Sequence, residues 1–372
     1  MLTLDLHVDT LMAIVHEQRR LEEATADVNG TLPPRQLDLP KMREGGLDAA
    51  VFSIFVTPYW RGPAASGRAH ALIDELADAL RRPAVAAGIV PVVTVDDLRA
   101  AVASGRRGAF IGIEGGHAID DSLERLREFA GRGIRYMTLT WSNANGWADS
   151  SGSAPVHGGL TPLGRDVVRE MERLGVLVDV SHVSDATIRD VLDCASSPII
   201  ASHSGCRAVH ENHRNLTDAQ LRAIAATGGV VGVPFHSEFL APVAPGGDWF
   251  APWRSGGEVL DPAAAEHADR RARPAEKPGA APLRALVDHM LHALEVAGPE
   301  HVALGSDFDG MIVPPVELAH VGRLPALRAA LVEAGVSGTE LDAVWGGNTL
   351  RVFRAAEGAM TARGDVEAWQ SA

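Results

Sequence analysis

Short apolar segments rich in β-branched residues recur along the chain, and each ends in polar or glycine residues. Between most of them lie amphipathic stretches of helical period, as in Ala69–Arg82, Ser122–Gly131, Pro162–Leu174 and Asp185–Cys194. The apolar segments predict eight strands: Leu4–Val8, Ala49–Val56, Ala109–Ile113, Tyr136–Thr140, Leu177–Ser181, Ile199–Ser202, Val230–Phe235 and Val302–Gly305. Near-continuous apolar strands that alternate with helices indicate a parallel sheet covered on both faces.

Eight such strands favour an α/β fold whose sheet closes into a (β/α)8 TIM-like barrel over an open, doubly wound sheet. No Gly-x-Gly-x-x-Gly follows the first strand, which weakens the alternative of a dinucleotide-binding fold. The length of 372 residues would permit two average domains, but barrels with insertions often reach it. We therefore interpret residues 1–372 as a single barrel domain.

Two segments interrupt this rhythm. Thr57–Ser66 contains Pro58, Gly62 and Pro63 and predicts an ordered loop after the second strand. The stretch at about residues 241–282 is rich in Pro, Gly and Ala, and it predicts an insertion after the seventh strand.

The composition narrows the range of partners. The formal net charge is −14 at pH 7, and an acidic surface argues against nucleic acid and anionic membranes, which both favour basic patches. The sequence has neither the features of a signal peptide nor an apolar run as long as a membrane span. Two cysteines, Cys194 and Cys206, are too few for a disulfide scaffold. We expect a cytoplasmic protein with no membrane segment and no nucleic-acid partner.

Side chains that can bind metals fall at the ends of five predicted strands. They are His7, Asp9, Glu114, His182, His203, Asp307 and Asp309. In a (β/α)8 barrel the carboxyl ends of the strands converge on one mouth, where the active site lies. Imidazole nitrogen and carboxylate oxygen are ligands that zinc prefers. The His-x-Asp pair of the first strand should point both side chains the same way, because side-chain direction repeats every second residue.

Each of these residues also has a structural explanation. A single histidine at a strand end is more often a hydrogen-bonded structural residue than a ligand. Asp307 or Asp309 could form a turn, since Asp-Gly at 309–310 is a turn signal. A set of potential ligands that share one orientation in the barrel is much harder to explain as accident. The joint pattern predicts a binuclear metal site.

One carboxylate must bridge the two metals, because cations about 3.5–4 Å apart need a shared anionic ligand. Many barrel amidohydrolases use a carbamylated lysine for this purpose. The chain contains two lysines, Lys41 and Lys277, and neither lies at the end of a predicted strand. Glu114 is therefore the expected bridge.

The ordered set of motifs resembles the membrane (renal) dipeptidase family and its bacterial members over nearly the whole chain. The segments that carry the resemblance are Asp5-Leu-His-Val-Asp-Thr10, Ile113-Glu-Gly-Gly-His117, Arg135-Tyr-Met-Thr-Leu-Thr140, Asp179-Val-Ser-His-Val-Ser184, Ala201-Ser-His-Ser204, Gly305-Ser-Asp-Phe-Asp-Gly310 and Gly347-Asn-Thr-Leu-Arg-Val-Phe353. The resemblance implies a dipeptidase with two Zn²⁺ per chain. Glu114 would bridge them, with His7 and Asp9 on one zinc and His182 and His203 on the other.

The resemblance also implies roles for Asp307 and Arg214. In metal-assisted amide hydrolysis, Asp307 would take the proton of the attacking water and deliver it to the leaving amine. Arg214, eleven positions after His203, would bind the C-terminal carboxylate of the substrate. The expected substrates are small dipeptides, including those with a C-terminal D-residue. The oligomeric state stays open, a homodimer included.

The chain departs from the family pattern at Trp141. Family members typically carry a histidine there, which polarises the scissile carbonyl. Asn143 and Asn145 follow and could donate to an oxyanion. We expect Trp141 to form an apolar wall of the substrate pocket, or else to pack under the mouth without touching substrate. The departure keeps two alternatives open: a metal-dependent hydrolase of other amides or lactams, and a metal-containing binding protein without turnover. The intact acid/base and carboxylate-binding residues speak against the second.

Overall fold

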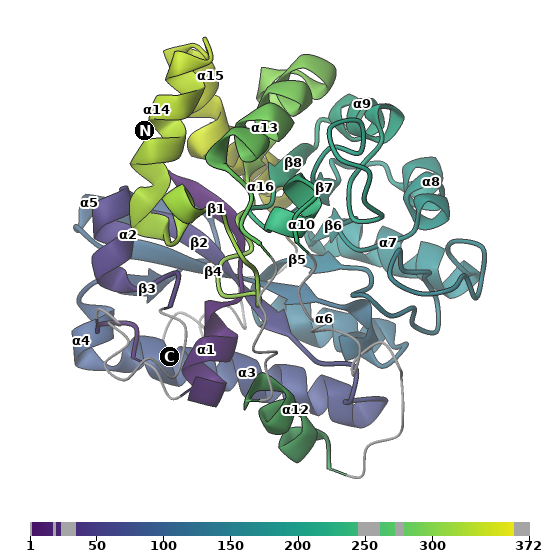
Figure 1. The fold of residues 1–372 in the computed structure, drawn as a ribbon. Helices are drawn as coiled ribbons and strands as arrows, with labels where there is room; N and C mark the ends of the chain where they lie inside the picture. The colour runs from purple at the N-terminus through teal and green to yellow at the C-terminus, as the bar shows by residue number, and fades with distance from the viewer. Residues whose placement is uncertain (1, 18–19, 24–34, 245–260, 272–278, 361–372) are drawn as a thin grey trace.

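The computed structural model describes residues 2–17, 20–23, 35–244, 261–271 and 279–360, and within these ranges eight parallel strands close into a barrel (Figure 1). The barrel strands are β1 Leu4–Val8, β2 Ala49–Phe55, β4 Arg107–Glu114, β5 Ile134–Thr138, β6 Leu177–Asp179, β7 Ile200–Ala201, β8 Val230–Val233 and β9 Val302–Leu304. The last strand pairs back with the first, and β2 pairs directly with β4. The predicted (β/α)8 barrel is confirmed. Each predicted strand is present: β1 has the predicted bounds, and one or both ends of the other seven are shifted.

The sequence pattern does not predict a further short strand, β3 (Ile89–Pro91). It pairs with Arg107–Ala109 of β4, on the edge that β5 occupies from Ile111 onward. Three residues are too few to establish a period, and Pro91 is a residue that strands avoid except at their ends and edges. The strand lies beside the barrel and does not enter its closure.

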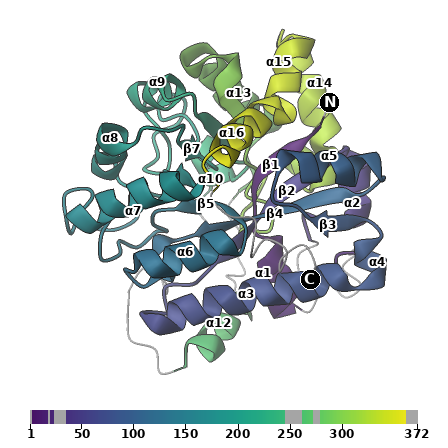
Figure 2. The same ribbon diagram turned by 180° about the vertical axis from the view of Figure 1, so that it is seen from behind.

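Helices surround the barrel on its outside (Figure 1, Figure 2). They are α1 Thr10–Glu17, α2 Leu39–Gly45, α3 Pro63–Arg81, α4 Pro83–Ala86, α5 Val95–Ala103, α6 Leu123–Gly131, α7 Pro162–Leu174, α8 Asp185–Cys194, α9 Asp218–Ala226, α10 Ser237–Leu240, α12 Pro262–Arg271, α13 Leu283–Ala297, α14 Leu324–Glu333, α15 Gly338–Asp342 and α16 Asn348–Glu357. Among the described residues, none of these helices combines the length and the apolar character needed to cross a membrane.

Helix α3 corrects the prediction of a loop over Thr57–Ser66, because it already begins at Pro63. A proline at the first helical position loses no hydrogen bond, since the N–H groups of the first turn have no partner within the helix. Pro63, which counts as a loop signal in the sequence pattern, instead starts the helix.

Side chains of the strands alternate between two buried clusters. On β2, for example, Ala49 and Val51 belong to one cluster, and Ala50 and Phe52 belong to the other. The first cluster contains Phe110, which shares its face of β4 with Glu114, and it fills the barrel interior. Its residues on the strands are Leu4, Leu6, Ala49, Val51, Phe110, Tyr136, Leu177, Ile200, Val230 and Ala303. The second packs the outer face of the strands against the helices.

Polar and glycine residues take the next inward positions toward the carboxyl ends of the strands. By the two-residue period of a strand these are Ser53, Gly112, Glu114, Thr138, Asp179, Ser202, Gly232 and Gly305. The barrel interior is thus apolar along most of its length and becomes polar at the carboxyl ends of the strands, where this fold places its active site.

Strand β1 contains a bulge immediately before the mouth. Three steps along β1, from Asp5 to Val8, face two steps along β2. The extra residue breaks the alternation, so that Leu6 belongs to the interior cluster and the adjacent His7 is also buried, with its ring beside Glu114. Bulges commonly redirect a side chain next to an active site.

The predicted insertion at about 241–282 lies partly outside the described residues. Its helix α12 lies beside α3 (Figure 1, Figure 2). Glu266 of α12 accepts a hydrogen bond from the indole N–H of Trp60 at 3.2 Å and lies 3.6 Å from Nε of Arg68. The interpretation of the whole chain as one domain stays a prediction.

Gly232 permits the close approach of strands below the mouth, and we expect Gly232→Ala to destabilise the barrel. A Cβ at this position would lie 2.1 Å from the backbone oxygen of Ser202. Forcing atoms into such a site costs about 1–3 kcal/mol. Gly67→Ala, on an exposed part of α3 with open space around its Cβ, is the matched control. It should stabilise by about 0.5–1 kcal/mol. Denaturant unfolding of the two variants measures the contrast, and equal stabilities would refute the packing argument.

Candidate functional site

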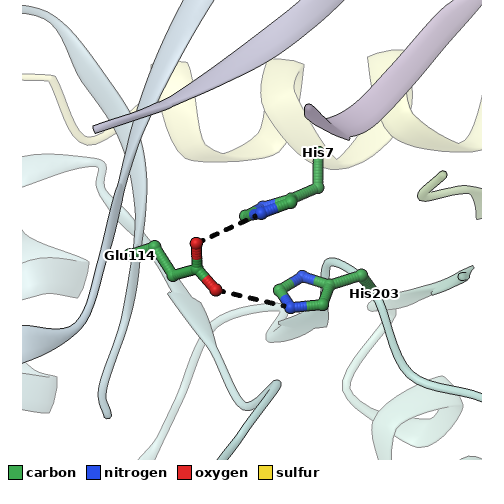
Figure 3. A group of neighbouring side chains, drawn as sticks. All are labelled: His7, Glu114 and His203. Carbon is green, nitrogen blue, oxygen red and sulfur yellow. Dashed lines mark ion pairs between the residues drawn. The ribbon is translucent and has the colours of Figure 1, made fainter. Parts of the chain in front are cut away.

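The carboxylate of Glu114, at the end of β4, stands between imidazoles on two sides (Figure 3). Its Oε2 lies 3.4 Å from Nε2 of His7 and accepts a hydrogen bond from Ser53 at 3.1 Å. Its Oε1 lies 3.0 Å from Nε2 of His182 and 3.7 Å from Nε2 of His203. The two oxygens therefore face different histidines, which is the arrangement that a carboxylate bridging two cations requires.

Asp9 and Asp307 approach the same cluster from the side of His7. One carboxylate oxygen of each lies 3.9 Å from Nε2 of His7. The ligand atoms of His7, Asp9 and Asp307 lie within 4.8 Å of one another, and so do those of His7, Glu114 and His203. The structure thus brings the five predicted ligands and the predicted acid/base together at one mouth.

The chemistry of these side chains fits divalent cations. Nε2 of His7 is buried and has no hydrogen-bond partner in the described part of the chain, although it faces carboxylates. Nε2 of His182 and Nε2 of His203 lie 2.9 Å apart, within hydrogen-bond distance, so both nitrogens point into the same small space. Imidazole nitrogens with carboxylate oxygens are the donors of catalytic zinc sites.

Two residues of the cluster adopt the left-handed backbone conformation, His182 with φ 67° and Asp307 with φ 64°. Two hydrogen bonds hold the backbone of His182. Its carbonyl accepts from Oγ of Ser150 at 3.1 Å and from the backbone N of Ser151 at 2.8 Å. The backbone N of Asp307 donates to the carbonyl of His7 at 3.0 Å. Residues with side chains rarely adopt this conformation, and such strain concentrates at functional sites.

Opposing effects set the protonation of the cluster. Burial alone would lower the pKa of His7, but the carboxylates of Glu114, Asp9 and Asp307 raise it to about 10. Burial raises the pKa of Asp307 well above its usual range, and the negative charge of Asp9 adds to the rise. Burial would also raise the pKa of Glu114, yet His7 and His182 hold it well below its usual range. Near neutral pH, the raised pKa values of His7 and Asp307 therefore keep a proton in the cluster, while the carboxylate of Glu114 is ionised.

The other two histidines are neutral. Burial, with the nearby charge of Arg214, lowers the pKa of His182 to about 3. Burial, with the charge of His7, lowers the pKa of His203 well below its usual range. A neutral imidazole offers a nitrogen lone pair to a cation, which is the form that a metal ligand needs.

Arg214 is buried beside the cluster, with 5% of its surface exposed. Its Nη2 donates to the carbonyl of His203 at 3.3 Å, and its guanidinium lies 5.4 Å from the ring centre of Phe239. Burial lowers its pKa to about 10, so the group stays charged at neutral pH. Its Nε has no hydrogen-bond partner among the described residues. A buried cation with a spare donor is suited to receive an anion.

Trp141 lines the cluster on the side of His182. Its ring centre lies 6.0 Å from that of His182 and 5.2 Å from that of Phe55, and the side chain is buried. This placement agrees with an apolar wall. Contact with substrate stays a prediction.

The two predicted asparagines contact mainly their own loop. Nδ2 of Asn145 donates to the carbonyl of Leu139 at 2.8 Å, and its Oδ1 accepts from the backbone N of Trp147 and of Ala148. Nδ2 of Asn143 donates to the adjacent carbonyl at 3.3 Å. These bonds give Asn145 a loop-stabilising role. Substrate binding by either asparagine stays a prediction that the geometry does not favour.

The sequence pattern did not single out Tyr136, whose hydroxyl lies 2.7 Å from Nδ1 of His7. The available signal was a tyrosine within an apolar strand, in a chain that has two tyrosines. Asp309, for which the sequence allows a role in a turn or in the site, accepts hydrogen bonds from the hydroxyl of Thr10 and the backbone N of Gln36, both at 2.7 Å. It connects three segments around the mouth.

A (β/α)8 barrel with imidazole and carboxylate ligands gathered at its mouth defines the class of barrel metalloenzymes. The sequence profile described as membrane dipeptidase, peptidase family M19, matches residues 1–364. This chain belongs to that family.

Individual relatives agree with this assignment. Dipeptidase tcpJ of Claviceps purpurea (strain 20.1) is 34% identical over 263 residues, which cover 70% of this chain and 54% of the relative. The chain thus spans about half the length of that relative. The crystal structure of dipeptidase AC, described as a metallopeptidase of family M19, is 27% identical with a TM-score of 0.77, covering 96% of this chain and 98% of the other. A metallopeptidase of Rhodobacter sphaeroides, liganded with a phosphinate mimic of the dipeptide L-Ala-D-Ala, is 26% identical with a TM-score of 0.77, covering 96% and 99%.

We expect metal binding to release protons, because His7 is protonated below a pKa of about 10 before metal binds. The apparent metal affinity should therefore rise with pH through the neutral range, about tenfold per pH unit for each proton displaced. Titration calorimetry in buffers of different ionisation enthalpy measures the proton count. The variant His7→Asn, which has no proton to lose at this position, is the control. An affinity that does not change between pH 6 and pH 8 would contradict the assignment of the proton.

Proposed function

We propose that this protein is a dipeptidase that holds two divalent cations, with zinc as the expected ion. The observation that carries the proposal is the carboxylate of Glu114, whose two oxygens face His7 on one side and His182 with His203 on the other. In the proposed arrangement His7 and Asp9 hold one cation, and His182 and His203 hold the second. Bound there, such ions activate water and polarise the substrate carbonyl.

Glu114 is the proposed bridge between the ions. Lys41 lies on α2, where its ammonium contacts Asp38 at 2.8 Å, and Lys277 lies outside the described residues. The ammonium of Lys41 is therefore already paired with Asp38, which does not belong to the ligand cluster. The low pKa of Glu114 keeps its carboxylate ionised, as a bridging ligand must be.

Asp307 is the proposed acid and base. Its raised pKa allows the carboxyl to hold a proton near neutral pH, and its oxygen lies 3.9 Å from Nε2 of His7, at the edge of the ligand cluster. A group with these properties can accept a proton from water and return it to the leaving amine of the peptide. The backbone N of Asp307 donates to the carbonyl of His7 at 3.0 Å, which holds the residue beside the cluster.

Arg214 is the proposed anchor for the C-terminal carboxylate of the dipeptide. Its buried charge and spare Nε donor support this role, and a planar guanidinium can bind a carboxylate through two parallel hydrogen bonds. An anchor this close to the metal ligands leaves room for few residues between the carboxylate and the scissile bond. We therefore propose dipeptides as the substrates.

A D-residue at the C-terminal position is a further part of the proposal. The structurally similar metallopeptidase of Rhodobacter sphaeroides holds a mimic of L-Ala-D-Ala, and its chain aligns with 96% of this one. Trp141, beside His182, would form the wall that favours small side chains near the scissile bond.

Trp141 also supports a second candidate, a hydrolase of other amides or lactams on the same metals. An indole beside His182 lacks the mobile proton of an imidazole, so carbonyl polarisation would depend more heavily on the metals. Acylated amino acids keep the carboxylate that Arg214 would bind and are the natural competitors to dipeptides.

The test of the function is a panel of L-X-L-Ala and L-X-D-Ala dipeptides beside N-acyl amino acids, assayed with the zinc-loaded protein. We expect dipeptides to be preferred and both Ala stereoisomers to be cleaved. Metal content, measured on the same preparations, should approach two ions per chain. Preference for acylated amino acids would support the second candidate, and no turnover of any compound would favour a binding protein.

Asp307→Asn should retain metal and lose about 10²–10⁴-fold in kcat, the usual contribution of a general acid–base group. The amide keeps the shape of the side chain and cannot exchange the proton. The matched control is Asp309→Asn, which removes a carboxylate two positions away that is bonded to Thr10 and Gln36. Near-normal kcat in Asp307→Asn would assign the proton transfer elsewhere.

Arg214→Ala should impair dipeptides more than their C-terminal amides. The loss of a buried, charge-assisted contact should cost about 2–5 kcal/mol in kcat/KM for the free acid. Arg214→Lys retains the charge without the planar fork and should lie between wild type and Arg214→Ala. Because Arg214 also donates to the carbonyl of His203, metal content must be equal in the compared proteins. An equal loss for acid and amide would exclude the anchor.

A further inference from the structure

A buried carboxylate, Asp179, lies beneath the ligand cluster and accepts four hydrogen bonds. Its Oδ1 accepts from the backbone N of Ser181 at 3.0 Å and of Ser202 at 2.8 Å. Its Oδ2 accepts from the hydroxyls of Thr138 and of Ser202, both at 2.6 Å. The donors come from β5, from the residues after β6 and from those after β7, so Asp179 joins three neighbouring strands in the polar layer of the barrel.

The hydroxyl of Ser202 connects this carboxylate to a proposed metal ligand. Its oxygen lies 2.8 Å from Nδ1 of His203 as well as 2.6 Å from Asp179. A serine hydroxyl has one hydrogen to donate, and two oxygens only 2.6 Å apart need a hydrogen between them. Asp179 is surrounded by donors, so the serine supplies that hydrogen to Asp179. The serine oxygen must then accept from His203, which places a proton on Nδ1.

We infer that Asp179, acting through Ser202, fixes His203 as the Nδ1–H tautomer and so directs the lone pair of Nε2 into the metal site. The inference rests on the proposed role of His203 as a metal ligand and adds two positioning residues to that site. Nε2 of His203, the ring nitrogen that does not contact Ser202, lies 3.7 Å from Glu114 (Figure 3). Partners of this kind orient ligand histidines and raise their basicity. Here a hydroxyl is interposed between the carboxylate and the imidazole.

The three candidate histidine ligands differ in this respect. Nδ1 of His203 contacts Ser202, and Nδ1 of His7 contacts the hydroxyl of Tyr136 at 2.7 Å. Nδ1 of His182 is buried and has no hydrogen-bond partner among the described residues. The chain from imidazole through hydroxyl to carboxylate therefore distinguishes His203 within the site, and its loss should affect the metal held by this residue.

Two variants form a matched pair, because each removes one of the two hydroxyl groups that donate a hydrogen bond to Oδ2 of Asp179. Ser202→Ala breaks the connection to His203, whereas Thr138→Val removes the other 2.6 Å donor and leaves the connection intact. Both positions are fully buried, so the cost to folding is comparable. We expect Ser202→Ala to weaken Zn²⁺ binding by about 10–100-fold, measured by chelator competition, and Thr138→Val to bind like wild type.

Nitrogen-15 NMR of the chelator-treated protein reads the tautomer directly, with His203→Asn to assign the signals. Wild type and Thr138→Val should show His203 with its proton on Nδ1, and Ser202→Ala should populate both tautomers. Unchanged affinity and tautomer in Ser202→Ala, or an equal loss of affinity in Thr138→Val, would overturn the inference. Failure of the wild type to bind Zn²⁺ would instead refute the proposed metal site, while the NMR comparison would still decide the role of Ser202.

Discussion

The buried charge of Glu114 is the constraint on which the mouth of this barrel depends. An ionised carboxylate taken out of water costs several kcal/mol unless partners surround it. Glu114 is 3% exposed, and its partners come from elements far apart in sequence: His7, Ser53, His182 and His203. The strand ends that carry them must therefore reach the same height around the barrel axis. Cations placed between these groups would further stabilise the same arrangement.

Much of the barrel and of its ligand set follows from the sequence for two physical reasons. A parallel strand buried on both faces must be apolar along its length, so segments such as Val230–Val233 are visible in the pattern. A polar residue directly after such a strand faces the mouth, so the sequence alone identifies His203 and Glu114 as candidate site residues. The same reasoning misses β3, because Ile89–Pro91 is too short to show a pattern.

Other features depend on contacts that a linear pattern does not contain. The bulge in β1 between Asp5 and Val8 arises from pairing with β2, yet His7 and Asp9 still converge, with 3.9 Å between Nε2 and a carboxylate oxygen. In the sequence pattern Tyr136 counts as one more apolar residue of its strand. Only the fold shows that its hydroxyl lies 2.7 Å from Nδ1 of His7. Asn145 looks like a free donor, although backbone groups of its own loop occupy its amide. The roles of such polar groups are decided by their neighbours in space.

The pairing of the first strand with the last also orders events during synthesis on the ribosome. Asp5 accepts from the backbone N of Ser306, 301 positions later, and Asp307 donates to the carbonyl of His7. His7 and Asp9 therefore leave the ribosome long before the segment that completes their surroundings. Until β9 arrives, β1 has an unpaired edge, and a nascent chain in this state is open to wrong pairing. An ion captured at that time would meet an incomplete set of ligands, so the finished centre can assemble only once nearly the entire barrel has been translated.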